Sequence, residues 1–123
     1  MSTLTVGLSF TSPAGDIATD ALSMSLTDNL TTATPNLGIS RLKAITASET
    51  VILTAAAAPT ATYIYVKNTD ATNVVVVKTD GAVNMMDLHP GEFSFMPLKG
   101  GVGLEVQAAG GDCVVEYAFW TKG

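Results

Sequence analysis

Residues 62–120 carry the sequence TYIYVKNTDATNVVVVKTDGAVNMMDLHPGEFSFMPLKGGVGLEVQAAGGDCVVEYAFW. Short apolar runs recur through this stretch at nearly even intervals, and Asn, Asp, Gly and Pro separate them. All-β sandwiches and barrels show this pattern, with a strand every roughly 8 to 12 residues and turn residues between strands. The stretch therefore predicts an all-β fold, a single-domain antiparallel β-sandwich that is jelly-roll-like, with eight or nine strands in the whole chain.

Particular turns and strands follow from the same stretch. Val74–Val77 is apolar on both faces and is expected to lie centrally in a sheet. Asp80-Gly81 predicts a type I′ hairpin turn, because both central residues of that turn need positive φ. His89–Glu92, with the sequence HPGE, predicts a type II turn with proline at the second position and glycine at the third.

The first half of the chain carries weaker strand signals. Apolar and polar residues alternate over residues 4–10 and again over residues 22–27, which is the period of a half-buried strand. Residues 31–38, with Pro35 and Asn36, predict a loop, and residues 39–46 and 50–56 predict weaker strands. We expect one domain over residues 1–123, with residues 1–21 as a possible extended amino-terminal arm and residues 22–123 as the sandwich.

Composition restricts the classes of partner. The chain has 123 residues, of which 47% are hydrophobic and only 14% are charged, and its formal net charge is −5. A surface with so few charges favours burial in an assembly, since ordinary domains are about one quarter charged. The negative charge argues against a nucleic-acid or anionic-membrane partner, because phosphate binding needs clustered Lys and Arg.

Targeting and redox signals are few. Residues 1–10 lack the basic start and continuous apolar run of a cleavable signal. The longest apolar stretch, residues 51–58, is far shorter than the about 20 residues that cross a bilayer. Cys113 is the single cysteine, so no internal disulfide is expected and synthesis in a reducing cytoplasm is predicted.

Three strings resemble small virion proteins of tailed bacteriophages: YIYVKNTDATNVVVV (residues 63–77), LHPGEFSFMPL (88–98) and VEYAFW (115–120). Members of that group often carry a similar Lys-Asn-Thr-Asp turn, an L-x-P-G-E turn and a final V-E-Y strand. The resemblance extends from about Leu22 onward and includes GISRLKAIT at residues 38–46. It implies a small β-sandwich structural component of the virion, similar to capsid cement or decoration proteins.

Histidine and cysteine chemistry is weakly supported. His89 precedes Pro-Gly as in cupin metal sites, but those sites need two or three histidines with a carboxylate, and only Asp87 and Glu92 lie nearby. We expect His89 to be a turn residue. Cys113 begins an alternating strand, which favours a buried thiol over a nucleophile.

The carboxylates suggest two other kinds of site, neither with a specific motif. A glycosidase needs two acids facing each other, and nothing in the spacing of the strand and turn acids predicts such a pair: Asp87, Glu92, Glu105 and Glu116. Calcium prefers oxygen ligands, but Asp16, Asp20 and Asp28 form no recognised loop.

The pairs Gly100-Gly101 and Gly110-Gly111 lack the Lys and Ser/Thr of a phosphate loop, and the sequon at Asn29 is taken as coincidence. We therefore assign no catalytic, cofactor-binding or metal-binding residue and expect no enzyme activity.

The aromatic residues allow a binding function through sugar stacking: Tyr63, Tyr65, Phe93, Phe95, Tyr117, Phe119 and Trp120. Phe93 with Phe95, and Tyr117 with Phe119, each share a strand face, so core packing is the favoured interpretation. Trp120 lies on the opposite face from Phe119 and is expected at a sheet edge or a subunit contact.

The resulting expectation is a structural protein with no enzymatic activity. We expect a capsid cement or decoration protein of the virion surface, made in the cytoplasm of a bacterial host. It is expected to bind the outer face of the major capsid protein lattice and to stabilise that lattice. It also binds its own copies, and a trimer is favoured. No nucleic acid, membrane or small-molecule substrate is expected. A phage tail or fibre-associated structural protein, a carbohydrate-binding β-sandwich module and, last, a cupin-type enzyme remain alternatives.

Overall fold

The computed structural model describes residues 2–13, 22–57 and 61–123, and within these ranges the chain forms strands and no helix. The all-β prediction is confirmed, with two antiparallel sheets. Nine strands lie in the described ranges: β1 (Ser2–Ser12), β2 (Leu22–Ala44), β3 (Thr50–Leu53), β4 (Thr62–Asn68), β5 (Val74–Thr79), β6 (Asn84–Leu88), β7 (Phe93–Leu98), β8 (Leu104–Ala109) and β9 (Cys113–Lys122).

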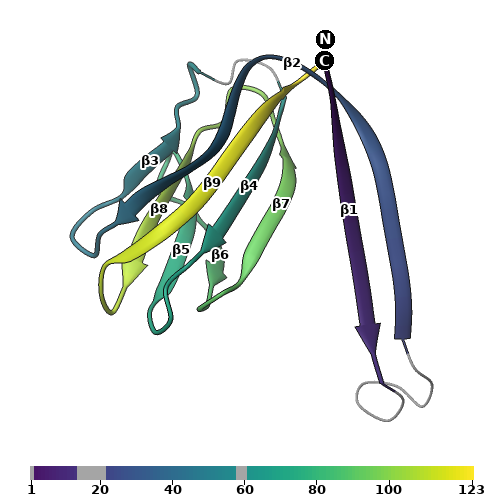
Figure 1. Cartoon of the computed structure of the whole chain (residues 1–123). Helices are drawn as coiled ribbons and strands as arrows, with labels where there is room; N and C mark the ends of the chain where they lie inside the picture. Colours follow the sequence, from purple (N-terminus) through teal and green to yellow (C-terminus); the bar gives the residue numbers. More distant parts are fainter. Residues whose placement is uncertain (1, 14–21, 58–60) are drawn as a thin grey trace. The chain divides into compact units, whose positions relative to one another are not determined.

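The chain divides into two compact units, Met1–Thr32 with Gly123, and Ala33–Lys122. In the first unit, β1 and the first part of β2 form an antiparallel two-stranded ribbon, which Figure 1 shows running side by side. The pairing is unbroken from Ser2 opposite Thr32 to Ser12 opposite Leu22. We call the paired residues 2–12 and 22–32 the arm.

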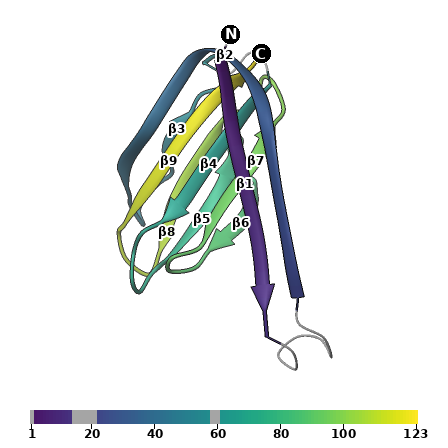
Figure 2. The same cartoon turned by 45° about the vertical axis from the view of Figure 1, so that its right-hand side comes forward.

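The second unit is a sandwich of two layers, seen from two directions in Figure 1 and Figure 2. One layer contains the later part of β2 followed by β9, β4 and β7, and the other has the order β3-β8-β5-β6. β5 is an inner strand of its sheet, as the run Val74–Val77 predicts. Side chains from both layers fill one core: Ala44, Ile52, Leu53, Ile64, Val66, Val75, Val77, Leu88, Leu98, Leu104, Val106, Ala108, Cys113 and Val115.

β2 overturns the predicted loop at residues 31–38, because the strand continues without a break from Leu22 to Ala44. Proline lacks a backbone N–H and is tolerated where one side of a strand is unpaired. Pro35 lies beyond Thr32, the last residue of β2 that pairs with β1. At Pro35 the edge of β2 that faced β1 therefore needs no hydrogen-bonding strand, and β9 is the neighbour on the other edge. Beyond it, the Thr121 N–H donates to Asn36 Oδ1, which joins β2 to β9.

The hairpin between β5 and β6 differs from the predicted type I′ turn. Ala82, with φ of 59°, has the positive φ in this loop, while Gly81 does not. The Ala82 N–H donates to the Thr79 carbonyl at 2.9 Å, and the Thr79 N–H donates to the Val83 carbonyl at 2.9 Å. This is the three-residue connection in which a left-handed residue follows a type I turn.

The HPGE turn is confirmed. Gly91 has φ of 80°, and the Glu92 N–H donates to the His89 carbonyl at 2.9 Å. Proline at the second position and a positive φ at the third define the type II geometry. The turn thereby reverses the chain between β6 and β7.

The two turns make opposite predictions for a glycine-to-alanine change. Gly91→Ala should lower the free energy of unfolding by about 1–2 kcal/mol, because a Cβ strains the left-handed backbone. Gly81→Ala should change it by less than about 0.5 kcal/mol, because its φ is not positive and a Cβ there meets nothing closer than 3.9 Å. Urea unfolding followed by circular dichroism measures both changes. An equal loss of stability for Gly81→Ala would indicate a positive φ at Gly81 and would therefore support the type I′ turn.

Candidate interaction surfaces

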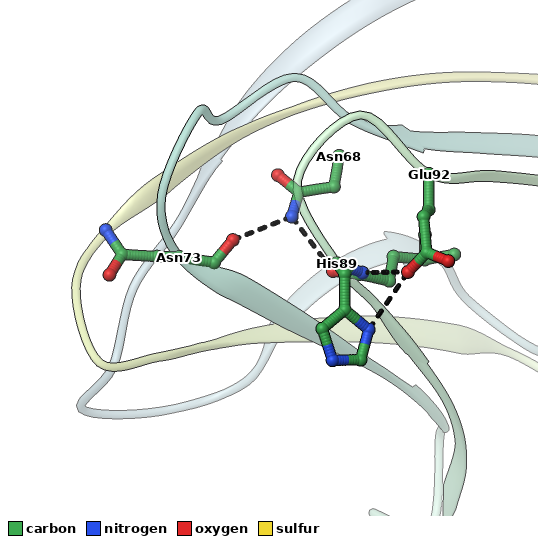
Figure 3. Close-up of polar contacts among 5 residues, drawn as sticks. Asn68, Asn73, His89 and Glu92 are labelled. Atoms are coloured by element: carbon green, nitrogen blue, oxygen red, sulfur yellow. Dashed lines mark hydrogen bonds and ion pairs between the residues drawn. The ribbon is translucent and has the colours of Figure 1, made fainter.

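A buried asparagine joins the loops at one end of the sandwich (Figure 3). Asn68 ends β4 and is fully buried, and its Nδ2 donates to the carbonyl oxygens of Asn73 and Leu88, each at 2.9 Å. Its Oδ1 accepts the Asp70 N–H at 3.0 Å. A buried amide of this kind stabilises a fold only when its hydrogen bonds are made, and here both ends of the amide are engaged.

Asp70 orders the loop that follows. Its Oδ2 accepts the N–H groups of Thr72 at 2.9 Å and Asn73 at 2.6 Å. Hydrogen bonds from the Asn73 and Thr72 backbone lower the pKa of this carboxyl group, since they favour its charged form. The Lys-Asn-Thr-Asp turn at residues 67–70 is thus a structural element of the loop corner.

Asn68→Ala should destabilise the protein by about 2–4 kcal/mol, because it leaves the buried Leu88 carbonyl, the part-buried Asn73 carbonyl and the Asp70 N–H without their partner. Asn84→Ala, at an exposed position of β6, is the matched control and should change stability by less than about 0.5 kcal/mol. Thermal and urea unfolding of both variants measures the difference. Equal stability of the two variants would show that Asn68 is not a structural support.

His89 is held by its own turn. Glu92 Oε1 lies 2.9 Å from His89 Nδ1 and accepts the His89 N–H at 2.6 Å, as Figure 3 shows. The histidine side chain is otherwise largely exposed. Among the described residues no three His, Cys, Asp or Glu side chains come together as a metal-binding group. The geometry therefore places His89 in a local turn interaction.

Cys113 is buried at the start of β9 and belongs to the core. Its Sγ donates to the Gly111 carbonyl at 3.4 Å. Burial, followed by the charges of Asp70 and Asp112, raises the pKa of the thiol, and a raised pKa disfavours the reactive thiolate.

The native protein should therefore react with a thiol reagent such as DTNB far more slowly than the unfolded chain. At pH 8 in buffer we expect less than about one tenth of the rate seen in 6 M guanidinium, because the reaction requires exposure and a thiolate. Fast native labelling would contradict the burial of Cys113.

The remaining polar candidates lie apart in separate local interactions. Glu116 accepts the Tyr65 hydroxyl proton at 3.0 Å and pairs with Arg41 at 3.3 Å. Glu105 lies on β8 opposite Val51, and Asp87 is exposed on β6. Asp28 lies in the arm, while Asp16 and Asp20 fall outside the described residues. The described acids thus have different partners: Glu92 bonds His89, and Glu116 bonds Arg41 and Tyr65.

The glycine pairs and the sequon also have local structural settings. Gly101, with φ of 79°, and Gly110, with φ of 93°, belong to turns between strands. Asn29 lies in the arm, where its Oδ1 accepts the Thr5 hydroxyl proton at 2.8 Å.

Aromatic side chains gather on the outer face of the sheet that contains β4, β7 and β9. We call this surface the aromatic face and define it by Ile39, Tyr63, Tyr65, Phe93, Phe95 and Trp120. Strand pairing sets Tyr65 opposite Phe95 and Tyr63 opposite Trp120. The Tyr63 and Phe95 rings stack with centroids 6.1 Å apart, and Trp120 lies 6.4 Å from Phe95. Ile39 and Phe93 are 62% and 60% exposed.

The core prediction for Phe93 and Phe95 is wrong. Alternation along β7 sends Ser94, Met96 and Leu98 inward instead, because they pair with the buried side of β4. For Tyr117 and Phe119 the core prediction is confirmed, since both pack against the buried cluster. The sequence identified pairs of residues that share a face but did not indicate which face is covered.

The arm has two faces of opposite chemistry. The pairing sets Leu8 opposite Leu26 and Phe10 opposite Met24, so both strands place their apolar residues on one face. This apolar face comprises Leu4, Val6, Leu8, Phe10, Met24, Leu26, Asp28 and Leu30. Its outer part is well exposed, and Leu26 reaches 58%.

The opposite face of the arm carries hydroxyl, amide and glycine residues: Thr3, Thr5, Gly7, Ser9, Thr11, Ser23, Ser25, Thr27, Asn29 and Thr31. The alternation within each strand was evident from the sequence. The register, which places two apolar sets on one side, comes from the structure alone. A one-residue shift would have mixed the two sets.

Comparison of the chain with protein-family models, curated proteins and solved structures gives no match. No helix in the described part of the chain is long and apolar enough to cross a membrane. The fold thus defines the class, an all-β sandwich with an amphipathic hairpin, and the function is inferred from its surfaces.

Proposed function

We propose that this protein is a structural component of a tailed-phage virion, without enzymatic activity, and that it decorates and stabilises the outer face of the major capsid protein lattice. The observation that carries the proposal is the amphipathic arm. A two-stranded ribbon is at best marginally stable in water, and a contiguous exposed apolar face marks an interaction site. The arm is therefore built to be covered by another protein surface.

Two further observations support the capsid surface as the location. The chain carries a net charge of −5, which suits an outer position better than contact with packaged DNA. The strand and turn motifs at residues 63–77 and 88–98 resemble virion proteins, and their turns meet at the loop corner around Asn68. A sparsely charged sandwich that carries an arm has the parts that a cement protein needs.

Purified protein should bind capsids that lack it, saturate at hundreds of copies per capsid and raise their resistance to heat. Capsid sedimentation, quantitative mass spectrometry of virions and thermal disruption assays measure these effects. Leu26→Asp should weaken binding at least about tenfold, because a charge on the apolar face opposes its burial anywhere in the assembled layer, against the lattice or against a neighbouring copy. Thr27→Asp, on the hydroxyl face of the arm, is the matched control.

Two other outcomes would contradict the assignment to the capsid surface. A copy number of about a dozen or fewer, with labelling at a single vertex, would identify a tail or fibre-associated protein. Absence of both capsid binding and stabilisation would exclude the cement function.

A carbohydrate-binding module is the second candidate, and the specific observation that favours it is the group of half-buried rings Tyr63, Phe95 and Trp120 on one sheet face. Partly exposed aromatic rings that lie side by side suit the apolar faces of sugars. Trp120 is the only tryptophan, so saturable quenching of its fluorescence by a glycan would support this candidate. A glycan panel without saturable binding would exclude it.

A further inference from the structure

Two apolar surfaces are exposed in this chain, and they belong to different units: the apolar face of the arm and the aromatic face of the sandwich. We propose that they cover each other between copies, so that the arm of one molecule lies with its apolar face on the aromatic face of a second molecule. This contact goes beyond the proposed function, and it does not require a capsid.

The arm and the aromatic face have comparable lengths, since the arm has 11 residue pairs and β9, which carries Trp120, has 10 residues. An arm of 11 residue pairs is about 37 Å long and, with strands about 4.8 Å apart, covers roughly 10 Å of width. The footprint is therefore about 370 Å² on each partner, or about 700 Å² per contact. In a two-fold dimer each copy gives its arm to the other, so the single interface holds two contacts and buries about 1,400 Å², which is within the range of specific interfaces. In a larger ring each interface holds one contact of about 700 Å², which is the size of a weak interface.

The chemistry of the two surfaces also agrees. Both are apolar sheet faces, and sheets pack face to face about 10 Å apart through interdigitated side chains. The arm would add a third layer outside the aromatic face. Its hydroxyl face would then point to solvent, which is where Thr5, Ser9 and Thr27 can be hydrated.

Charge complementarity favours this partner over a second arm. Asp28 is the one charged side chain among the described residues of the arm, and it lies on the apolar face. Two arms packed face to face would bring their Asp28 carboxylates into one apolar layer. The aromatic face instead carries two lysines: Lys67 lies on the same side of β4 as Tyr65, and Lys122 Nζ lies 5.3 Å above the Tyr63 ring. Its carboxylate, Glu116, lies opposite Lys67 and is already engaged by Arg41 and by the Tyr65 hydroxyl.

Lys67 is available for this contact. It makes no ion pair among the described residues, whereas Arg41 and Lys43 are engaged by Glu116 and Asp112. A buried carboxylate needs a cationic or hydrogen-bonding partner, and Lys67 and Lys122 provide one on the aromatic face. An arm-to-face contact of this kind joins different surfaces of the two copies, so it forms a ring when the rotation closes.

The first experiment measures the mass of purified full-length protein by light scattering between about 1 and 100 µM, without capsids. Wild-type protein should be oligomeric, and both Leu26→Asp in the arm and Phe93→Asp in the aromatic face should shift it to monomer. Thr27→Asp and Val51→Asp, at exposed positions on the other face of the arm and on β3, should keep the oligomer. Trp120 emission should shift to longer wavelength only in the two disrupting variants.

The second experiment identifies the contact itself. A chain with Leu8→Cys is mixed with a differently tagged chain carrying Phe93→Cys, and the mixture is oxidised under native conditions. Disulfides between the two chains should dominate, because the arm of one copy lies over the aromatic face of the other. Buried Cys113 should remain unmodified in both chains.

Several results would overturn the inference. A monomeric wild-type protein at 100 µM, or disruption by Leu26→Asp but not by Phe93→Asp, would exclude the aromatic face as the partner of the arm. Cross-links only between two Leu8→Cys chains would show arm-to-arm packing, and cross-links only within a chain carrying both changes would show an arm on its own sheet. Oligomers that form normally but do not bind capsids would leave this inference standing and exclude the capsid function, so the two failures are distinguishable.

Discussion

The apolar core between the two sheets of residues 33–122 is the interaction on which the rest of the structure depends. Ile64 and Val66 from one sheet and Leu104 and Val106 from the other are almost completely removed from water. Burial of such side chains contributes about 1.5–3 kcal/mol each and sets which side of every strand points inward. Because strand side chains alternate, fixing the inner face of a strand also fixes what its outer face presents.

The same alternation produces the surfaces that carry the proposed function. β4 buries Ile64 and Val66, so Tyr63 and Tyr65 must point outward, and pairing with β7 and β9 brings Phe95 and Trp120 beside them. In the arm, by contrast, no second sheet is needed to define two faces. Register alone places Leu8 with Leu26 on one side and Ser9 with Ser25 on the other. Folding thus leaves two apolar surfaces that a partner molecule can cover.

Most of the strands from β4 to β9 could be predicted, because their alternation and their turn residues are local signals. The HPGE turn was predictable for the same reason, since proline and glycine each restrict or permit a particular φ. The turn after Thr79 was not, because Asp-Gly suits more than one hairpin geometry and the length of the loop selects among them. The loop predicted at residues 31–38 failed because pairing with β9 outweighed the preference of Pro35 and Asn36 for a turn.

The sequence alone determined the all-β class, the positions of most strands along the chain and the scarcity of reactive side chains, since these depend on composition and on period-two patterns. Only the tertiary structure decided that Phe93 and Phe95 face outward, that Asn68 is buried, and that the arm separates apolar from hydroxyl residues. Period-two alternation distributes residues between the two faces of a strand, but it does not show which face is buried. Which face is buried depends on pairing with strands distant in the sequence, and that pairing exists only in the folded chain.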